Sequence, residues 1–126
     1  MTESSYYGDI TRYYLENATN NIAWEAKFSR TKYINFSCLP AHQEEKLLEA
    51  ERVYGLKIPD AGIMRKPFDG FVLYKATSLF IAIYYLPRLT EVYEIPIRSF
   101  LKEKYESGKK SLSKERAAEI GKLIYL

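Results

Sequence analysis

Cysteine, long apolar runs and a strong excess of one charge are all scarce in this chain. The single cysteine, Cys38, cannot form a disulfide within the chain, so an intracellular, cytoplasmic location is the default expectation. The first nine residues are polar and lack the basic and apolar segments of a signal peptide. The longest apolar run, residues 79–86, is far shorter than the roughly 20 residues that span a bilayer. We therefore expect a soluble protein without a membrane partner.

The length of 126 residues predicts one domain, residues 1–126, with a single hydrophobic core. The net charge of +3 permits nucleic-acid binding without requiring it. Basic residues form three groups along the sequence: one at and after residue 27, one in a loop near residue 65, and one that begins just before a basic tail at about 107–126 and continues into it. These residues are Lys27, Arg30 and Lys32; Arg65 and Lys66; and Lys102, Lys104, Lys109, Lys110, Lys114 and Arg116. The alternative is that most of them only solvate exposed faces.

Residues 21–28, NIAWEAKF, alternate apolar side chains with others, and this period of two predicts a β-strand. Glu25 and Lys27 then point in the same direction, about 6–7 Å apart along the chain. Such a pair suits metal-dependent phosphodiester chemistry, in which Glu25 binds a divalent ion and Lys27 faces the phosphate or the attacking water. The alternative is an ordinary Glu and Lys pair on a solvated sheet surface.

A helix is predicted from Pro40 to about Tyr54, because proline is tolerated in a first turn and apolar residues recur on one face. Gln43 lies one turn before Leu47, which places it at the rim where this helix meets the sheet. His42 is either a helix-start hydrogen-bonding residue or a catalytic base. Gly55 is expected to end the helix in the left-handed conformation.

Three short motifs occur in this order along the sequence: W-E-A-K-F with T-K shortly after it, F-S-x-L, and H-Q at a helix start. In these motifs the sequence resembles the Holliday junction resolvases of the RecU type. The resemblance covers about residues 21–50 and does not reach the C-terminal tail. It implies a restriction-endonuclease-like fold of the PD-(D/E)xK class, an α/β domain whose mixed sheet is flanked by helices. It also implies that Glu25 and Gln43 contribute to a Mg²⁺ or Mn²⁺ site beside Lys27, that branched DNA is the partner, and that the protein is a homodimer.

The resemblance also implies an aspartate on the strand before E-x-K, and the sequence has no such strand. The segment K-P-F-D-G, followed by an apolar run, offers Asp69 as a displaced substitute, provided that its strand lies beside residues 21–28. Asp60 is the second choice, because it leads into Ala-Gly rather than into a strand. Either aspartate is alternatively a turn residue after proline.

The remaining elements follow from local patterns. We expect a first helix over 6–17, with Asp9 and Glu16 as further acidic candidates or as surface carboxylates. Expected next are a hairpin arm or short edge strand over 32–36, a hairpin of 71–75 and 79–86 around A-T-S, a strand over 91–97, a helix or strand extension over 99–105, and a helix over 114–124 capped by Ser113.

Two functions are consistent with these patterns. The first is a Mg²⁺- or Mn²⁺-dependent endonuclease acting on branched DNA. Glu25, Lys27 and Asp69 would be catalytic, Gln43 would complete the metal site, and phosphates would be bound by Arg30, Lys32, Arg65 and Lys66. The second is a catalytically inactive protein of the same fold that binds DNA or takes part in an assembly.

Overall fold

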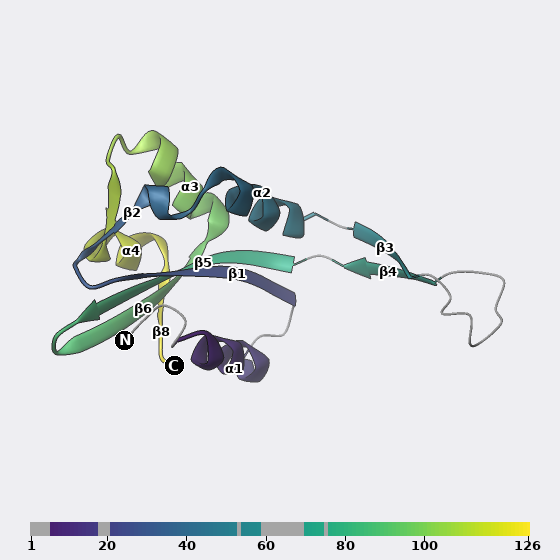
Figure 1. Cartoon of the computed structure of the whole chain (residues 1–126), viewed down its shortest axis with the longest axis horizontal. Coiled ribbons are helices and arrows are strands. Elements are labelled where there is room, and N and C mark those ends of the chain that lie inside the picture. The colour runs from purple at the N-terminus through teal and green to yellow at the C-terminus, as the bar shows by residue number, and fades with distance from the viewer. Residues whose placement is uncertain (1–5, 18–20, 53, 59–69, 75) are drawn as a thin grey trace.

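The computed structural model describes residues 6–17, 21–52, 54–58, 70–74 and 76–126, with the backbone alone for 54–58 and 70–74. The architecture is mixed α/β, as the sequence predicts (Figure 1). The first helix packs on one face of a four-stranded sheet, and the other described helices contribute buried residues to the cluster on the opposite face. Among the described helices, none has both the length and the apolar character that crossing a membrane requires.

Four strands form the central sheet in the order β1-β5-β6-β8. They are β1 (Asn21–Ser29), β5 (Ala76–Leu86), β6 (Leu89–Pro96) and β8 (Lys122–Ile124). Strands β1 and β5 are parallel, whereas β5 pairs antiparallel with β6 and β6 antiparallel with β8. Two short ladders lie outside this sheet: β2 (Tyr33–Asn35) with β7 (Ser111–Ser113), and β3 (Tyr54–Ile58) with β4 (Gly70–Tyr74).

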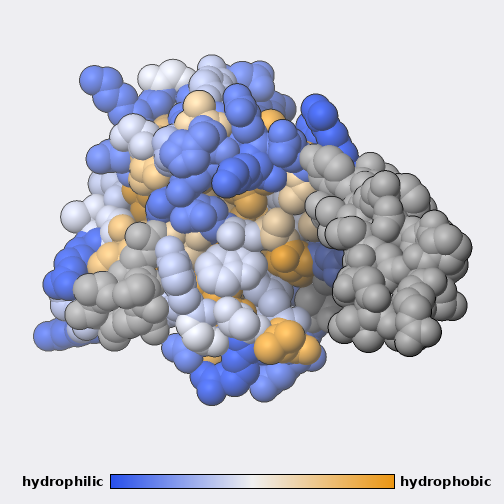
Figure 2. All heavy atoms as spheres, turned by 45° about the vertical axis from the view of Figure 1, so that its right-hand side comes forward, coloured by the Kyte–Doolittle hydropathy of each residue, from blue (hydrophilic) through white to orange (hydrophobic). Residues whose placement is uncertain are grey.

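The helices are α1 (Tyr7–Asn17), α2 (Ala41–Ala50), α3 (Ile97–Glu106) and α4 (Lys114–Ile120), with a 3-10 turn, η2 (Phe36–Cys38). Helix α1 packs on one face of the sheet, where Ile10 contacts the apolar cluster that includes Ala26 and Ile81. Helices α2 and α3 cover the other face, as Figure 1 shows. Their outward sides are hydrophilic over most of the upper surface in Figure 2.

Strand β5 is the centre of the core because both of its faces are covered. Its side chains from Leu79 to Tyr84 are all buried, which explains why this stretch is a continuous apolar run rather than an alternating one. Alternate residues enter the two clusters: Phe80 packs against Phe100 of α3 with ring centroids 3.9 Å apart, and Ile81 packs on the α1 side. The face of any β1 residue can therefore be read from its partner in β5.

The structure corrects two boundaries and one pairing. Helix α2 ends at Ala50, and Gly55 lies within β3 rather than at a helix end. The carbonyl of Leu47, one of the last four of the helix, accepts a hydrogen bond from the buried Ser78 hydroxyl, so this helix end is satisfied well before Gly55. The predicted hairpin is also wrong, because β4 pairs with β3 and β5 already begins at Ala76.

Other expectations are confirmed. Strand β6 follows a turn as predicted, α3 is the helical alternative, and the Ser113 hydroxyl accepts a hydrogen bond from the backbone N–H of Arg116 at 3.1 Å. The segment over 32–36 forms an edge strand rather than a hairpin arm, since β2 pairs with β7 and not with β1.

Residues 107–126 are more than a basic tail with a closing helix. Leu112, Ala117 and Ile124 are buried in the two clusters, and β8 extends the central sheet. Helix α4 ends at Ile120 instead of about Ile124. The next residue, Gly121, lies so close to β6 that an added Cβ would be 2.6 Å from the carbonyl oxygen of Glu94. Only glycine fits there.

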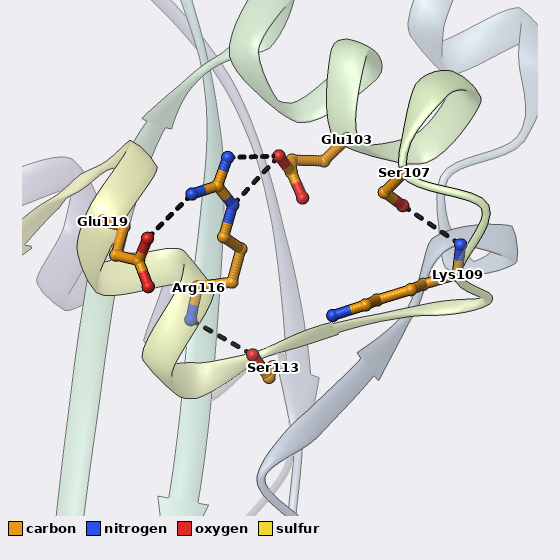
Figure 3. A network of polar contacts seen from close by, with 6 residues as sticks. All are labelled: Glu103, Ser107, Lys109, Ser113, Arg116 and Glu119. Atoms are coloured by element: carbon orange, nitrogen blue, oxygen red, sulfur yellow. Dashed lines mark hydrogen bonds and ion pairs between the residues drawn. The ribbon is translucent and has the colours of Figure 1, made fainter.

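Helix α4 is held to α3 by one guanidinium. Arg116 donates from Nε and Nη2 to Oε1 of Glu103, at 3.0 and 2.7 Å, and from Nη1 to Glu119 at 2.8 Å (Figure 3). The hydrogen bonds from Arg116 hold the pKa of the Glu103 carboxyl below its ordinary value. This network joins two helices that are close in sequence but separated by β7.

We expect Gly121→Ala to lower the free energy of unfolding by about 1–3 kcal/mol, because its methyl group overlaps β6. The matched control is Gly8→Ala, where an added Cβ meets nothing within 4 Å and helix propensity predicts a gain of about 0.5–1 kcal/mol. Urea unfolding of both variants measures the difference. Equal effects of the two substitutions would contradict the close approach at Gly121.

Because the pKa of Glu103 is lower in the folded state, its contribution to stability is present above the unfolded pKa and is lost as pH falls through the folded one. Glu103→Gln should therefore lower the free energy of unfolding near pH 7 by up to about 1 kcal/mol, a small effect since Arg116 is partly solvated. The difference from the unaltered protein should shrink as pH falls below the ordinary range of a glutamate carboxyl, as measured by urea unfolding across pH. The exposed Glu106, on the same helix, provides the control substitution to glutamine.

Candidate functional site

Glu25 and Lys27 lie on the sheet face that α2 and α3 cover. Glu25 pairs in register with Phe80 and Lys27 with Ala82, and both partners belong to the cluster on that side. Neighbours in a parallel pair point to the same face, so the predicted alternation of β1 is confirmed. Oε1 of Glu25 lies 3.2 Å from Nζ of Lys27, and their side chains are 26% and 18% exposed. The pair is thus neither a solvated surface pair nor a sealed one.

Gln43 reaches the same region from α2. The hydrogen bond from Ser78 to Leu47 fixes the last turns of α2 over β5 at the level of Ala23, the partner of Ser78 in register. Figure 1 shows that α2 runs in the opposite direction to β1. Moving back four residues from Leu47 to Gln43 covers about 6 Å of helix, and moving on two residues from Ala23 to Glu25 covers about 6–7 Å of strand. Gln43 therefore lies at about the level of Glu25.

The amide of Gln43 carries an unsatisfied oxygen. Its Oε1 is buried and has no hydrogen-bond partner among the described residues. A buried carbonyl-type oxygen without a partner costs about 1–3 kcal/mol, so its retention calls for a reason outside packing. An amide oxygen is also one of the ligand types that Mg²⁺ and Mn²⁺ accept. The residues present therefore fit an oxygen-ligated ion in kind, with Glu25 and Gln43 as two donors.

The second carboxylate is not placed. Asp69 and Asp60 lie outside the described residues. The premise for Asp69, that its strand lies beside β1, is not met: β4 pairs with β3, and the neighbour of β1 in the central sheet is β5. Throughout the described part of the chain, no group of three or more His, Cys, Asp or Glu side chains could hold a metal ion.

The acidic candidates on the first helix are excluded from this site. Helix α1 packs on the face of the sheet opposite to Glu25. Asp9 forms an ion pair with Arg12 at 2.8 Å, and Glu16 is exposed. Both behave as surface carboxylates. His42 is exposed in the first turn of α2, one residue before Gln43.

Two of the predicted phosphate-binding residues follow directly after β1. Arg30 and Lys32 are exposed in the turn between β1 and β2, at the end of the strand that carries Lys27. The guanidinium of Arg30 lies over the rings of Phe28 and Tyr85, at 5.8 and 6.0 Å, which fixes its direction. Arg65 and Lys66 lie outside the described residues.

A buried polar cluster on α2 and α3, centred on Glu44, is absent from the candidate residues that the sequence analysis names. Glu44 is buried, and it accepts hydrogen bonds from the Tyr105 hydroxyl at 3.0 and 2.8 Å and from the ammonium of Lys104. The hydrogen bond to Glu44 raises the pKa of Tyr105. The signal was available, because Glu44 lies three and four residues before Leu47 and Leu48 on the inner face of the helix.

No family model, curated protein or solved structure matches this chain. The resemblance to junction resolvases therefore rests on the residues of the segment over 21–50, and the site itself rests on the geometry of Glu25, Lys27 and Gln43.

Proposed function

We propose that this protein is a metal-dependent DNA endonuclease with a restriction-endonuclease-like fold, acting on branched DNA such as Holliday junctions. It is supported best by the Glu25–Lys27 pair on the sheet face that α2 covers, together with the buried, unsatisfied oxygen of Gln43 on that helix at about the level of Glu25. A carboxylate and an amide oxygen can hold a divalent ion, and an ammonium beside them can stabilise negative charge on a phosphate, so the three groups suit hydrolysis of a phosphodiester by a metal-activated water.

The metal site in this proposal is completed from outside the described residues. Glu25 and Gln43 would hold Mg²⁺ or Mn²⁺ together with Asp69 or Asp60, because a single carboxylate binds a divalent ion weakly. The bound ion would polarise the scissile phosphate and lower the pKa of a water molecule.

Lys27 would stabilise the negative charge that develops on the phosphate during cleavage. Its ammonium lies 3.2 Å from Oε1 of Glu25. It would face the phosphate oxygens as negative charge develops on them, and partial exclusion of water would strengthen this interaction. The same contact holds Glu25 and Lys27 in a fixed relative position before DNA arrives.

Backbone phosphates away from the scissile bond would be bound by Arg30 and Lys32, and by Arg65 and Lys66 from the region outside the described residues. Binding of this kind weakens steeply with salt and reads shape rather than sequence. If the substrate is a four-way junction, two symmetric strands must be cut, which requires a homodimer.

The second candidate function is a DNA-binding or assembly protein without catalytic activity. Two observations favour it: the described residues contain no group of three metal-ligating side chains, and Glu25 already has Lys27 as a partner. On this account Glu25 and Lys27 stabilise the edge of the sheet, and the basic residues carry the interaction.

The two functions are separated by cleavage of labelled linear duplex, flap and four-way-junction DNA with Mg²⁺ or Mn²⁺. We expect cleavage by the unaltered protein and a loss of about a hundredfold or more in Glu25→Gln, Lys27→Ala and Asp69→Asn, with DNA binding retained. Glu45→Gln and Lys46→Ala, at exposed positions of α2, are the matched controls. Binding without metal-dependent cleavage of any of the three substrates would leave the non-catalytic function.

Gln43 offers a test that combines stability with activity. Gln43→Met removes an unsatisfied buried oxygen, so the free energy of unfolding should stay the same or rise by up to about 1 kcal/mol. Cleavage should fall at least tenfold, with a higher Mg²⁺ concentration at half-maximal rate, because a metal ligand is lost. Leu47→Ala, one turn further on, should instead lose about 2–5 kcal/mol of stability. Full activity in a destabilised Gln43→Met would show a purely structural role.

A further inference from the structure

A cavity of about 560 Å³ lies between the segment leading into α2 and the end of α3. It is distinct from the position of Glu25, which is on β1. Its walls combine apolar and aromatic surface with two lysines and two small polar side chains. The lining residues are Asn35, Phe36, Ser37, Leu39, Pro40, Lys104, Tyr105 and Lys110.

One wall of the cavity is held in place by the buried Glu44. Its carboxylate accepts hydrogen bonds from both Lys104 and Tyr105, which are adjacent in the chain. Lys104 also donates to the carbonyl of Leu39 at 2.9 Å, and this contact joins α3 to the opposite wall. Phe36 is fixed in turn by its ring contact with Phe100 and by its backbone N–H donating to the carbonyl of Lys110. The cavity is therefore built by polar and aromatic contacts rather than left by loose packing.

Tyr105 has the geometry of a stacking platform. Its side chain is 66% exposed although its hydroxyl is bound to Glu44, so the ring is oriented but not covered. The ammonium of Lys104 lies 5.4 Å from the ring centroid, and because most of the residue is exposed, ring surface remains for a planar group. A fixed, exposed aromatic ring is the feature on which nucleobases stack.

The lysines supply positive charge beside this ring. Among the described residues Lys104 has two acceptors, Glu44 and Leu39, for the three protons of its ammonium, and Lys110 is exposed at the rim. Because Glu44 neutralises Lys104, the net positive charge of the cavity comes from Lys110. Asn35 and Ser37 add donors and acceptors suited to a base edge or a sugar.

We propose that this cavity binds one unpaired nucleotide of a DNA strand, with the base on Tyr105 and the phosphate on Lys110. The volume accommodates a base and a sugar, and the pairing of an aromatic ring with lysines is that of single-strand binding sites. The choice of DNA as the ligand rests on the proposed function. The inference adds a substrate feature to it: an unpaired nucleotide, such as a flap or an open branch point provides.

Binding is measured without metal, in EDTA, so that cleavage does not enter. The probes are a labelled single-stranded oligodeoxynucleotide, followed by fluorescence anisotropy, and thymidine 5′-monophosphate against inorganic phosphate, followed by amide chemical shifts of the full chain. We expect the mononucleotide to shift the amides of residues 35–39 and 104–110, and inorganic phosphate alone to shift them much less.

Tyr105→Ala should weaken oligonucleotide binding about tenfold, whereas Tyr105→Phe should bind within about twofold of the unaltered protein, because it keeps the ring and loses only the hydroxyl bound to Glu44. The Phe variant therefore also controls for any loss of folding caused by breaking that hydrogen bond. Tyr125→Ala, at an exposed tyrosine outside the cavity, is the matched control.

Lys110→Gln should weaken binding several-fold and reduce the slope of log affinity against log salt by about 0.7. The control is Lys102→Gln, at an exposed position on the same helix as Tyr105, and it should change neither the affinity nor the slope. Equal effects of Tyr105→Ala and Tyr125→Ala, or mononucleotide shifts confined to other residues, would overturn the proposal. So would identical shifts from phosphate and mononucleotide. Retained binding in EDTA together with absent cleavage would support the cavity and reject the endonuclease, so the two failures are distinguishable.

Discussion

The parallel pairing of β1 with β5, with α2 crossing over both, is the constraint on which the rest of the structure depends. The register places Glu25 and Lys27 beside Phe80 and Ala82 and so turns both charged side chains toward α2. The buried hydrogen bond from Ser78 to Leu47 fixes α2 along the sheet and brings Gln43 to the level of Glu25. A shift of one residue in this register would turn the pair to the α1 face and separate it from Gln43.

The local elements were predictable wherever a pattern repeats along one segment. The period of two over 21–28 gave the strand and the direction of Glu25 and Lys27, and Ser113 marked the start of α4. Partners distant in the sequence were not predictable, because pairing depends on which edges meet in the fold. The short strands β7 and β8 have no signal of their own, and the A-T-S segment looks like a turn although Ser78 is a buried strand residue.

The same distinction between local and distant contacts applies to the candidate site. Glu25 and Lys27 lie on β1 and Gln43 lies on the next helix, α2, and the structure brings these two elements together as expected. The prediction for Asp69 required the strand that follows it to lie beside residues 21–28, which is a question of long-range topology. That strand, β4, pairs with β3. Acidic residues are rarely buried, yet Glu44 is, because Lys104 and Tyr105, which lie 60 and 61 residues further along the chain, donate hydrogen bonds to it. A charge is buried where distant partners compensate it, and those partners are invisible in the segment itself.

The metal site proposed at Glu25 and Gln43 can be tested by paramagnetic broadening of amide resonances with Mn²⁺ added well below the protein concentration. We expect selective loss of the signals of residues 25–27 and 43, together with those near Asp60 or Asp69, and recovery of all of them on addition of EDTA. The same titration of Glu25→Gln should leave these signals intact. Broadening confined to exposed carboxylates elsewhere, such as Glu106 or Glu119, or no selective broadening at all, would contradict it.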